Sequence, residues 1–101
     1  MRLADKVSFC SMPGQCELMA ESAINCWIVR FFPDGRQELY LNLKRVEGVG
    51  PRSPLRTLVC QCADNLAADI VAYMNAKDTL AGSQLFWAIK GKLEHFNRKG
   101  K

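Results

Sequence analysis

The segment from Cys26 to Val46 constrains the fold most, because it carries the pattern of a β-hairpin. Residues 26–32 are rich in β-branched and aromatic side chains and end at the turn sequence Pro-Asp-Gly, residues 33–35. The returning residues 36–46 alternate, with Leu39, Leu41 and Leu43 on one face and Glu38, Tyr40, Asn42 and Lys44 on the other. A period of two predicts a half-buried antiparallel strand, so we expect a hairpin over 26–46.

Two other segments have strand character. Residues 55–62 place Leu58, Cys60 and Cys62 on one face and a largely apolar set on the other, which predicts a central strand. Lys6 to Met12 is a possible N-terminal strand that ends at Pro13-Gly14. Residues 15–25 fit either a helix or an extended segment that leads into the hairpin.

The last third of the chain has helical periodicity. Asp64 can cap a first helix, whose apolar face carries Leu66, Ile70, Tyr73 and Met74. A second helix, capped by Asp78 or Thr79 or restarted at Ser83, has a stripe of Phe86, Ile89, Leu93 and Phe96.

These elements predict one α+β domain over residues 1–101, with a small antiparallel sheet packed against two C-terminal α-helices. The sheet would comprise the hairpin 26–46, the strand 55–62 and the possible N-terminal strand. A chain of 101 residues with 49% apolar side chains can bury one core. The expected core is Leu39, Leu41, Leu43, Leu58, Ile70, Phe86, Ile89 and Leu93.

The cysteines predict free thiols rather than disulfides or a metal site. Their number, five, is odd, and the first residues lack the apolar stretch of a signal peptide, so we expect a cytoplasmic protein. The spacings between Cys10, Cys16 and Cys26, and the single residue between Cys60 and Cys62, do not fit a zinc knuckle. No apolar stretch approaches the ~20 residues that span a bilayer, so no membrane partner is expected.

The sequence does not propose a reaction. His95 is the only histidine and lies near the end of a basic helix, where a surface role is commoner than catalysis. The glycine-rich loop at residues 48–51 lacks the Lys-Ser/Thr of a phosphate-binding loop. We therefore expect no enzyme activity and no cofactor.

The net charge of +4 arises at the C-terminus, where residues 90–101 carry five cations and one acid. On a helical projection at 100° per residue, Trp87 lies about 150° from the apolar stripe, so it is expected to face outward. Lys90, Arg98, Lys99 and Lys101 lie around it or follow it. An exposed tryptophan with a basic rim is typical of an interface hot spot or of a base-stacking position.

The polar face of the hairpin is a second candidate site. Tyr40 and Lys44 lie two positions apart on one side, and Arg30 from the neighbouring strand could join them. An aromatic ring between cations is found on platforms that bind single-stranded nucleic acid. A solvated sheet face has the same composition.

Two classes of function follow. The first is a non-enzymatic protein that binds and blocks a larger protein or nucleoprotein assembly; the alternative is direct binding of RNA or DNA through the basic C-terminal helix. In size, compactness and lack of any motif, the chain resembles the small proteins that phages and mobile elements make against host defence, anti-CRISPR proteins among them. This resemblance implies an inhibitor and assigns no residue.

Overall fold

The computed structural model describes residues 7–46, 54–76 and 78–99, and it has an α+β fold. Five strands form one antiparallel sheet in chain order, and two helices follow. The elements are β1 (Val7–Met12), β2 (Gln15–Glu21), β3 (Cys26–Phe31), β4 (Gln37–Leu41), β5 (Lys44–Val46), α1 (Pro54–Asn75) and α2 (Leu80–Lys99). The predicted fold class, an antiparallel sheet packed against two C-terminal helices, is confirmed.

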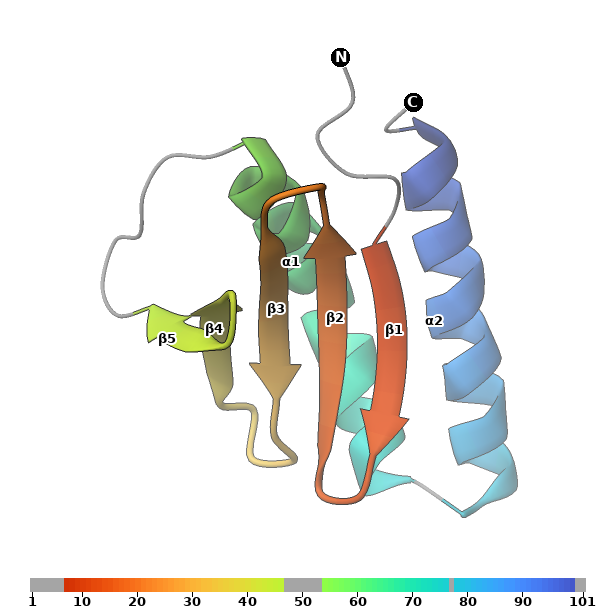
Figure 1. Cartoon of the computed structure of the whole chain (residues 1–101). Helices are drawn as coiled ribbons and strands as arrows, with labels where there is room; N and C mark the ends of the chain where they lie inside the picture. Colours follow the sequence, from red (N-terminus) through yellow and green to blue (C-terminus); the bar gives the residue numbers. More distant parts are fainter. Residues whose placement is uncertain (1–6, 47–53, 77, 100–101) are drawn as a thin grey trace.

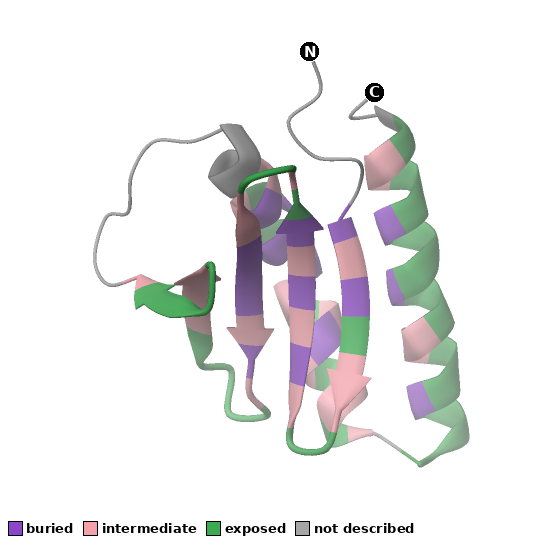
Figure 2. Ribbon diagram, viewed as in Figure 1, coloured by how far each residue is buried: buried purple, intermediate pink, exposed green. Residues whose placement is uncertain are grey.

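The helices cover one side of the sheet and leave the other side open. Helix α1 lies behind β1, β2 and β3, and α2 runs beside the edge strand β1, where it contacts both α1 and β1 (Figure 1). Buried residues recur along the strands and helices (Figure 2). The buried apolar residues form one cluster except for Ile28, which alternates with Trp27 and Val29 and so lies on the other face of β3. The core lies between the sheet and the helices, so the outer side of α2 and the front of the sheet face solvent.

Alternation along the strands decides which side chains enter this core. Along β2, the burial pattern is strictly alternate, with Cys16, Leu18 and Ala20 buried. Cross-strand pairs continue the same face, since Leu18 lies opposite both Phe9 and Val29. The segment 15–25, which the sequence left open, is therefore a strand up to Glu21, and the possible N-terminal strand is present as β1.

The prediction of a strand over residues 55–62 is wrong, because these residues form the first turns of α1. The buried side chains of α1 recur at intervals of three and four, which is the period of a helix: Val59, Cys62, Ala63, Leu66 and Ile70. Because residues 55–62 are apolar on both faces, the helical period was not evident in the sequence. Asp64 lies inside α1 as an exposed residue rather than capping its start.

The hairpin departs from prediction after Leu41. The chain turns at Asn42 and Leu43, whose φ angles of 50° and 71° are those of a two-residue type I′ turn, and returns as β5. Leu43 is 84% exposed at this turn, so its predicted place in the core is wrong. Of the other predicted core residues, Ile70, Ile89 and Leu93 are buried, and Leu39, Leu41, Leu58 and Phe86 are partly buried against them.

Helix α2 is held at three points. Thr79 caps its start, because its Oγ1 accepts a hydrogen bond from the Gly82 backbone N at 3.0 Å. Lys92 Nζ lies 2.6 Å from Asp69 Oδ2 on α1. Near its end, Asn97 binds the edge of the sheet: its Oδ1 accepts from the Val7 backbone N at 2.8 Å, and its Nδ2 donates to the Val7 carbonyl at 3.0 Å. These contacts fix which side of α2 faces outward.

Candidate protein-binding surface

Trp87 lies on the outer side of α2, as the helical projection predicts. It is 69% exposed, whereas Ile89, two residues later, is fully buried. The only ring contact of the indole among the described residues is with its neighbour Phe86, edge to face at 5.4 Å between centroids. Most of the area of this large side chain is therefore outside the fold.

Leu80, which the sequence reasoning missed, lies on the same side of the helix, as does Gly91. Leu80 is 77% exposed and precedes Trp87 by seven residues, which is close to two helical turns. Gly91 follows Trp87 by four residues, and a Cβ added to it would meet nothing within 4 Å. The seven-residue spacing in the sequence could have identified Leu80, but the expected start of the helix ranged from 78 to 83.

The cations of α2 are divided between the inner and outer sides. Lys90 Nζ lies 5.5 Å from the Phe86 ring centroid, beside Trp87, and Arg98 is exposed near the helix end. Lys92 is paired with Asp69, and Glu94 brings an exposed carboxylate to the outer side. Two predicted members, Lys101 and the side chain of Lys99, lie outside the described residues.

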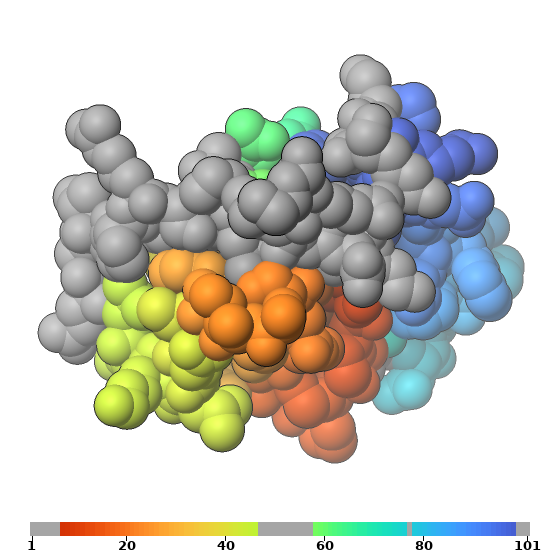
Figure 3. Space-filling model, turned by 45° about the horizontal axis from the view of Figure 1, so that its top comes forward, coloured from red at the N-terminus to blue at the C-terminus, as the bar shows by residue number. Residues whose placement is uncertain are grey.

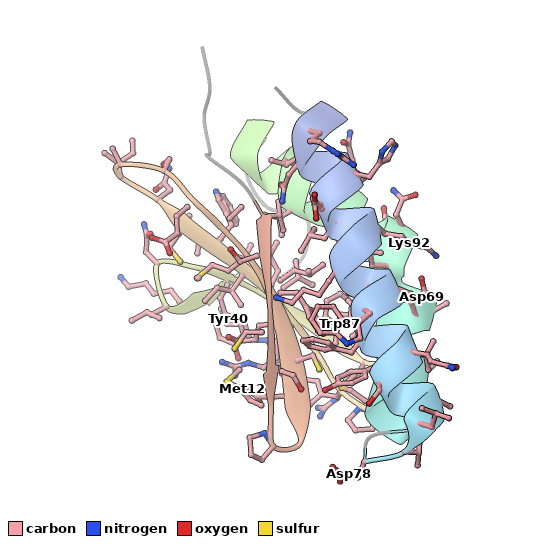
Figure 4. All side chains as sticks on the ribbon, turned by 90° about the vertical axis from the view of Figure 1, so that its right-hand side faces the viewer. Met12, Tyr40, Asp69, Asp78, Trp87 and Lys92 are labelled. Carbon is pink, nitrogen blue, oxygen red and sulfur yellow. The ribbon has the colours of Figure 1, made fainter. Side chains whose placement is uncertain are left out.

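We refer to the exposed residues Leu80, Trp87, Lys90, Gly91 and Arg98 as the α2 outer surface. Its centre is apolar, since it combines an indole with bare helix backbone at a glycine, and Lys90, Glu94 and Arg98 give it a rim of mixed charge. In Figure 4 Trp87 lies about half-way along α2, and Asp78 lies at the end where the helix begins. An apolar centre with a polar rim is the composition of a protein interface.

The open face of the sheet carries a charge-balanced network around Arg30. Its Nε lies 3.0 Å from Glu17 Oε2, and its guanidinium carbon is 4.6 Å from the centre of the Tyr40 ring. Tyr40 in turn donates a hydrogen bond of 2.8 Å from its hydroxyl to Glu38 Oε1, which raises the pKa of the phenol. Arg45 Nη1 completes the network 3.8 Å from Glu38 Oε2.

The structure brings Arg30 and Tyr40 together but places Lys44 elsewhere. The turn after Leu41 reverses the chain, so Lys44 lies opposite Leu41, and Arg45 is the residue opposite Tyr40. Within the network two arginines face two glutamates, and the Arg30 guanidinium occupies one face of the Tyr40 ring. This arrangement offers neither excess positive charge nor a bare stacking ring on that side.

A smaller apolar patch lies where two turns meet. Ile24 and Leu43 are 82% and 84% exposed, and the turns that carry them are joined by a 3.2 Å hydrogen bond from Asn42 Nδ2 to Asn25 Oδ1. Figure 3 shows the end of the β2–β3 hairpin and the β4–β5 hairpin side by side on the surface. The sequence predicted neither exposed residue.

Metal and thiol chemistry have little support in the described part of the chain. There, no group of three or more His, Cys, Asp or Glu side chains could hold a metal ion. None of the five cysteines forms a disulfide in the structure. Burial raises the pKa of the Cys62 thiol to about 11, which keeps it protonated and unreactive near neutral pH.

Neither helix in the described residues is long and apolar enough to cross a bilayer. Comparison of the chain with protein-family models, with curated proteins and with solved structures finds no match in any of the three. The α2 outer surface is therefore interpreted from its own chemistry.

Proposed function

We propose that this chain is a non-enzymatic binding protein that recognises a larger protein through the α2 outer surface. The observation that carries the proposal is the 69% exposure of Trp87 at the centre of a helix whose opposite side belongs to the core. Tryptophan is among the residues most enriched at interface hot spots, where burial of the ring excludes water from its contacts. Leu80 on the same side extends the apolar area.

A protein partner fits this surface better than a nucleic acid. Binding to phosphates needs several cations that are free to approach the backbone. On α2, Lys92 is engaged by Asp69, and Glu94 lies among the remaining cations, which include Lys90 and Arg98. On the open face of the sheet, Arg30 and Arg45 are matched by glutamates. Nucleic-acid binding therefore remains the alternative, with the basic end of α2 as its site.

Inhibition of a host protein or nucleoprotein complex is the biological role we propose for such a surface. A small domain can block a larger assembly without chemistry when its rigid surface covers a functional site of the partner. Helix α2 meets this requirement of rigidity, because Lys92 pairs with Asp69 on α1 and Asn97 binds the Val7 backbone on β1.

The test is a comparison of three tagged proteins: wild type, Trp87→Ala and Ile24→Ala. Ile24 is the matched control, because it is an exposed large apolar residue on a different surface. Chains captured by the wild type are identified, purified and titrated against all three. We expect Trp87→Ala to weaken binding by more than about 1 kcal/mol at an unchanged melting temperature, with no loss for Ile24→Ala.

Two results would contradict the proposal. Equal affinity of wild type and Trp87→Ala would remove the α2 outer surface from the interface. Capture of nucleic acid by the purified protein, with an affinity that falls steeply as salt is raised, would favour the alternative, because release of counterions from phosphates produces that dependence.

A further inference from the structure

The α2 outer surface is complementary to itself. Trp87 is a projecting ring, and Gly91, on the same side and one turn later, is a gap in the row of side chains. In a two-fold symmetric contact, the patch on one copy meets the same patch on the other. The projecting ring of each copy can therefore fill the gap on the other copy. If the two helices run antiparallel and the two-fold axis crosses them at the level of residue 89, each Trp87 lies over the Gly91 of the other copy.

The charges at the two ends of α2 favour the same arrangement. Asp78 is exposed just before the helix begins, and Arg98 is exposed near its end. Within the described residues neither side chain forms an ion pair. An antiparallel pair centred on Ala88 would bring each Asp78 beside the Arg98 of the other copy, whereas a parallel pair would place like charges together. The contact of Trp87 with Gly91 and the pairing of Asp78 with Arg98 therefore place the two-fold axis at nearly the same level of α2.

Gly91 has no structural explanation within one copy. Glycine inside a helix costs about 1 kcal/mol relative to alanine, and an added Cβ would have open space around it. Close approach of another backbone is a common reason for a helix position without a side chain. The Gly91 position is therefore consistent with a helix packed directly on it.

We propose that two copies of this chain associate through antiparallel packing of their α2 helices, with Trp87 of each copy seated on Gly91 of the other. This inference rests on the proposed function, because it assigns a second copy to the same surface. Self-association would then compete with the larger partner for Trp87. One helix pair is smaller than a standard interface, so the dimer is expected to be weak and to depend on concentration.

Sedimentation of the purified protein over a concentration series from about 1 µM to about 1 mM tests the dimer. We expect the mass to rise from 11.4 kDa toward twice that value as concentration increases. Gly91→Leu should fill the hole and abolish the rise while the monomer stays folded, because the position is exposed and an added Cβ meets nothing within 4 Å in its own copy. Trp87→Ala should raise the dissociation constant about tenfold or more.

Two control variants change exposed apolar area away from the proposed contact. Ile24→Ala shortens an exposed side chain on the turn between β2 and β3, and Ala81→Leu enlarges an exposed position on another side of α2. Both variants should dimerise like the wild type. Loss of the dimer in either control would place the interface elsewhere and overturn the inference.

A charge exchange tests the antiparallel direction. Asp78→Arg alone would set arginine against arginine at both ends of the dimer, and Arg98→Asp alone would set aspartate against aspartate. We expect each variant to be monomeric by itself and an equal mixture of the two to dimerise, since mixing restores opposite charges at both ends. Melting temperatures of both variants show whether they are folded. Failure of the mixture to associate would overturn the antiparallel arrangement.

The outcomes separate this inference from the proposed function. A wild type that stays monomeric at the highest concentration, or a dimer indifferent to Gly91→Leu, overturns the inference. The proposed function is measured separately, by the effect of Trp87→Ala on binding to the captured partner. If that effect is found with a monomeric wild type, the inference fails and the proposed function stands.

Discussion

The two tryptophans of this chain have opposite environments. Trp27 on β3 is 1% exposed and belongs to the core, and its Nε1 has no hydrogen-bond partner within the part of the chain that the structure describes. Trp87 on α2 is 69% exposed and touches one ring. The fold gains packing from the buried ring of Trp27, whereas it gains little from Trp87. The same residue type therefore contributes to stability at one position and is available for binding at the other.

Replacing each tryptophan by alanine should give two variants that differ most in their free energy of unfolding. Trp27→Ala removes a buried ring and leaves a cavity, so we expect a loss of about 3–5 kcal/mol in the free energy of unfolding. Trp87→Ala should change it by less than about 0.5 kcal/mol, because an exposed side chain keeps its contact with water. Denaturant unfolding of both variants measures the difference. Similar losses would mean that the indole of Trp87 is packed.

The same contrast explains which features the sequence could predict. The hairpin, the helical stripe and the outward position of Trp87 follow from periodicity alone, because one face of each element is apolar and the other polar. The start of α1 was missed because 55–62 is apolar on both faces. The exposure of Leu43 was missed because alternation continues through the sequence, while the chain reverses at a turn that lacks glycine. The place of Gly91 beside Trp87 follows from the same periodicity, whereas the open space around an added Cβ is known only from the structure.

The cysteines extend the comparison of inner and outer positions to reactivity. Cys62 is fully buried and its pKa is raised to about 11, whereas Cys10 is exposed on the open face of the sheet. At pH 8 the higher pKa alone reduces the thiolate fraction of Cys62 about 100-fold relative to an ordinary thiol. We expect Cys62 to react with a disulfide reagent much more slowly than Cys10, because its sulfur is buried as well as protonated, whereas Cys10 is exposed.

Reagent labelling followed by peptide mass analysis measures the two rates. The control is the protein in denaturant, in which Cys10 and Cys62 should react at similar rates because burial is lost. Rapid labelling of Cys62 in the native protein would show that the space between the sheet and α1 opens readily.

Asn97 tests how the inner and outer sides of α2 are fixed. It forms two hydrogen bonds with the backbone of Val7 on the edge strand, so Asn97→Ala should cost about 1–2 kcal/mol. Asn65→Ala is the matched control, because Asn65 is exposed and its side chain donates to the Gln61 carbonyl in its own helix. Hydrogen exchange at the Val7 amide should accelerate in Asn97→Ala alone. An unchanged exchange rate would show that α2 is held by its other contacts.

Leu43→Gly should have the smallest effect on stability, and it tests whether the exposed turn belongs to the surface or to the core. The φ of 71° at Leu43 is in the region that costs a side-chain-bearing residue about 1–2 kcal/mol, and glycine avoids this cost. Glycine also costs about 0.5–1 kcal/mol more in entropy on folding, so the expected net gain for Leu43→Gly is about 0–1.5 kcal/mol. Thermal melting measures it. Leu41→Gly, two residues earlier in β4 and packed against the core, should lose stability instead. A loss in Leu43→Gly as well would mean that this side chain contributes packing to the folded chain, and that the exposed turn belongs with the core after all.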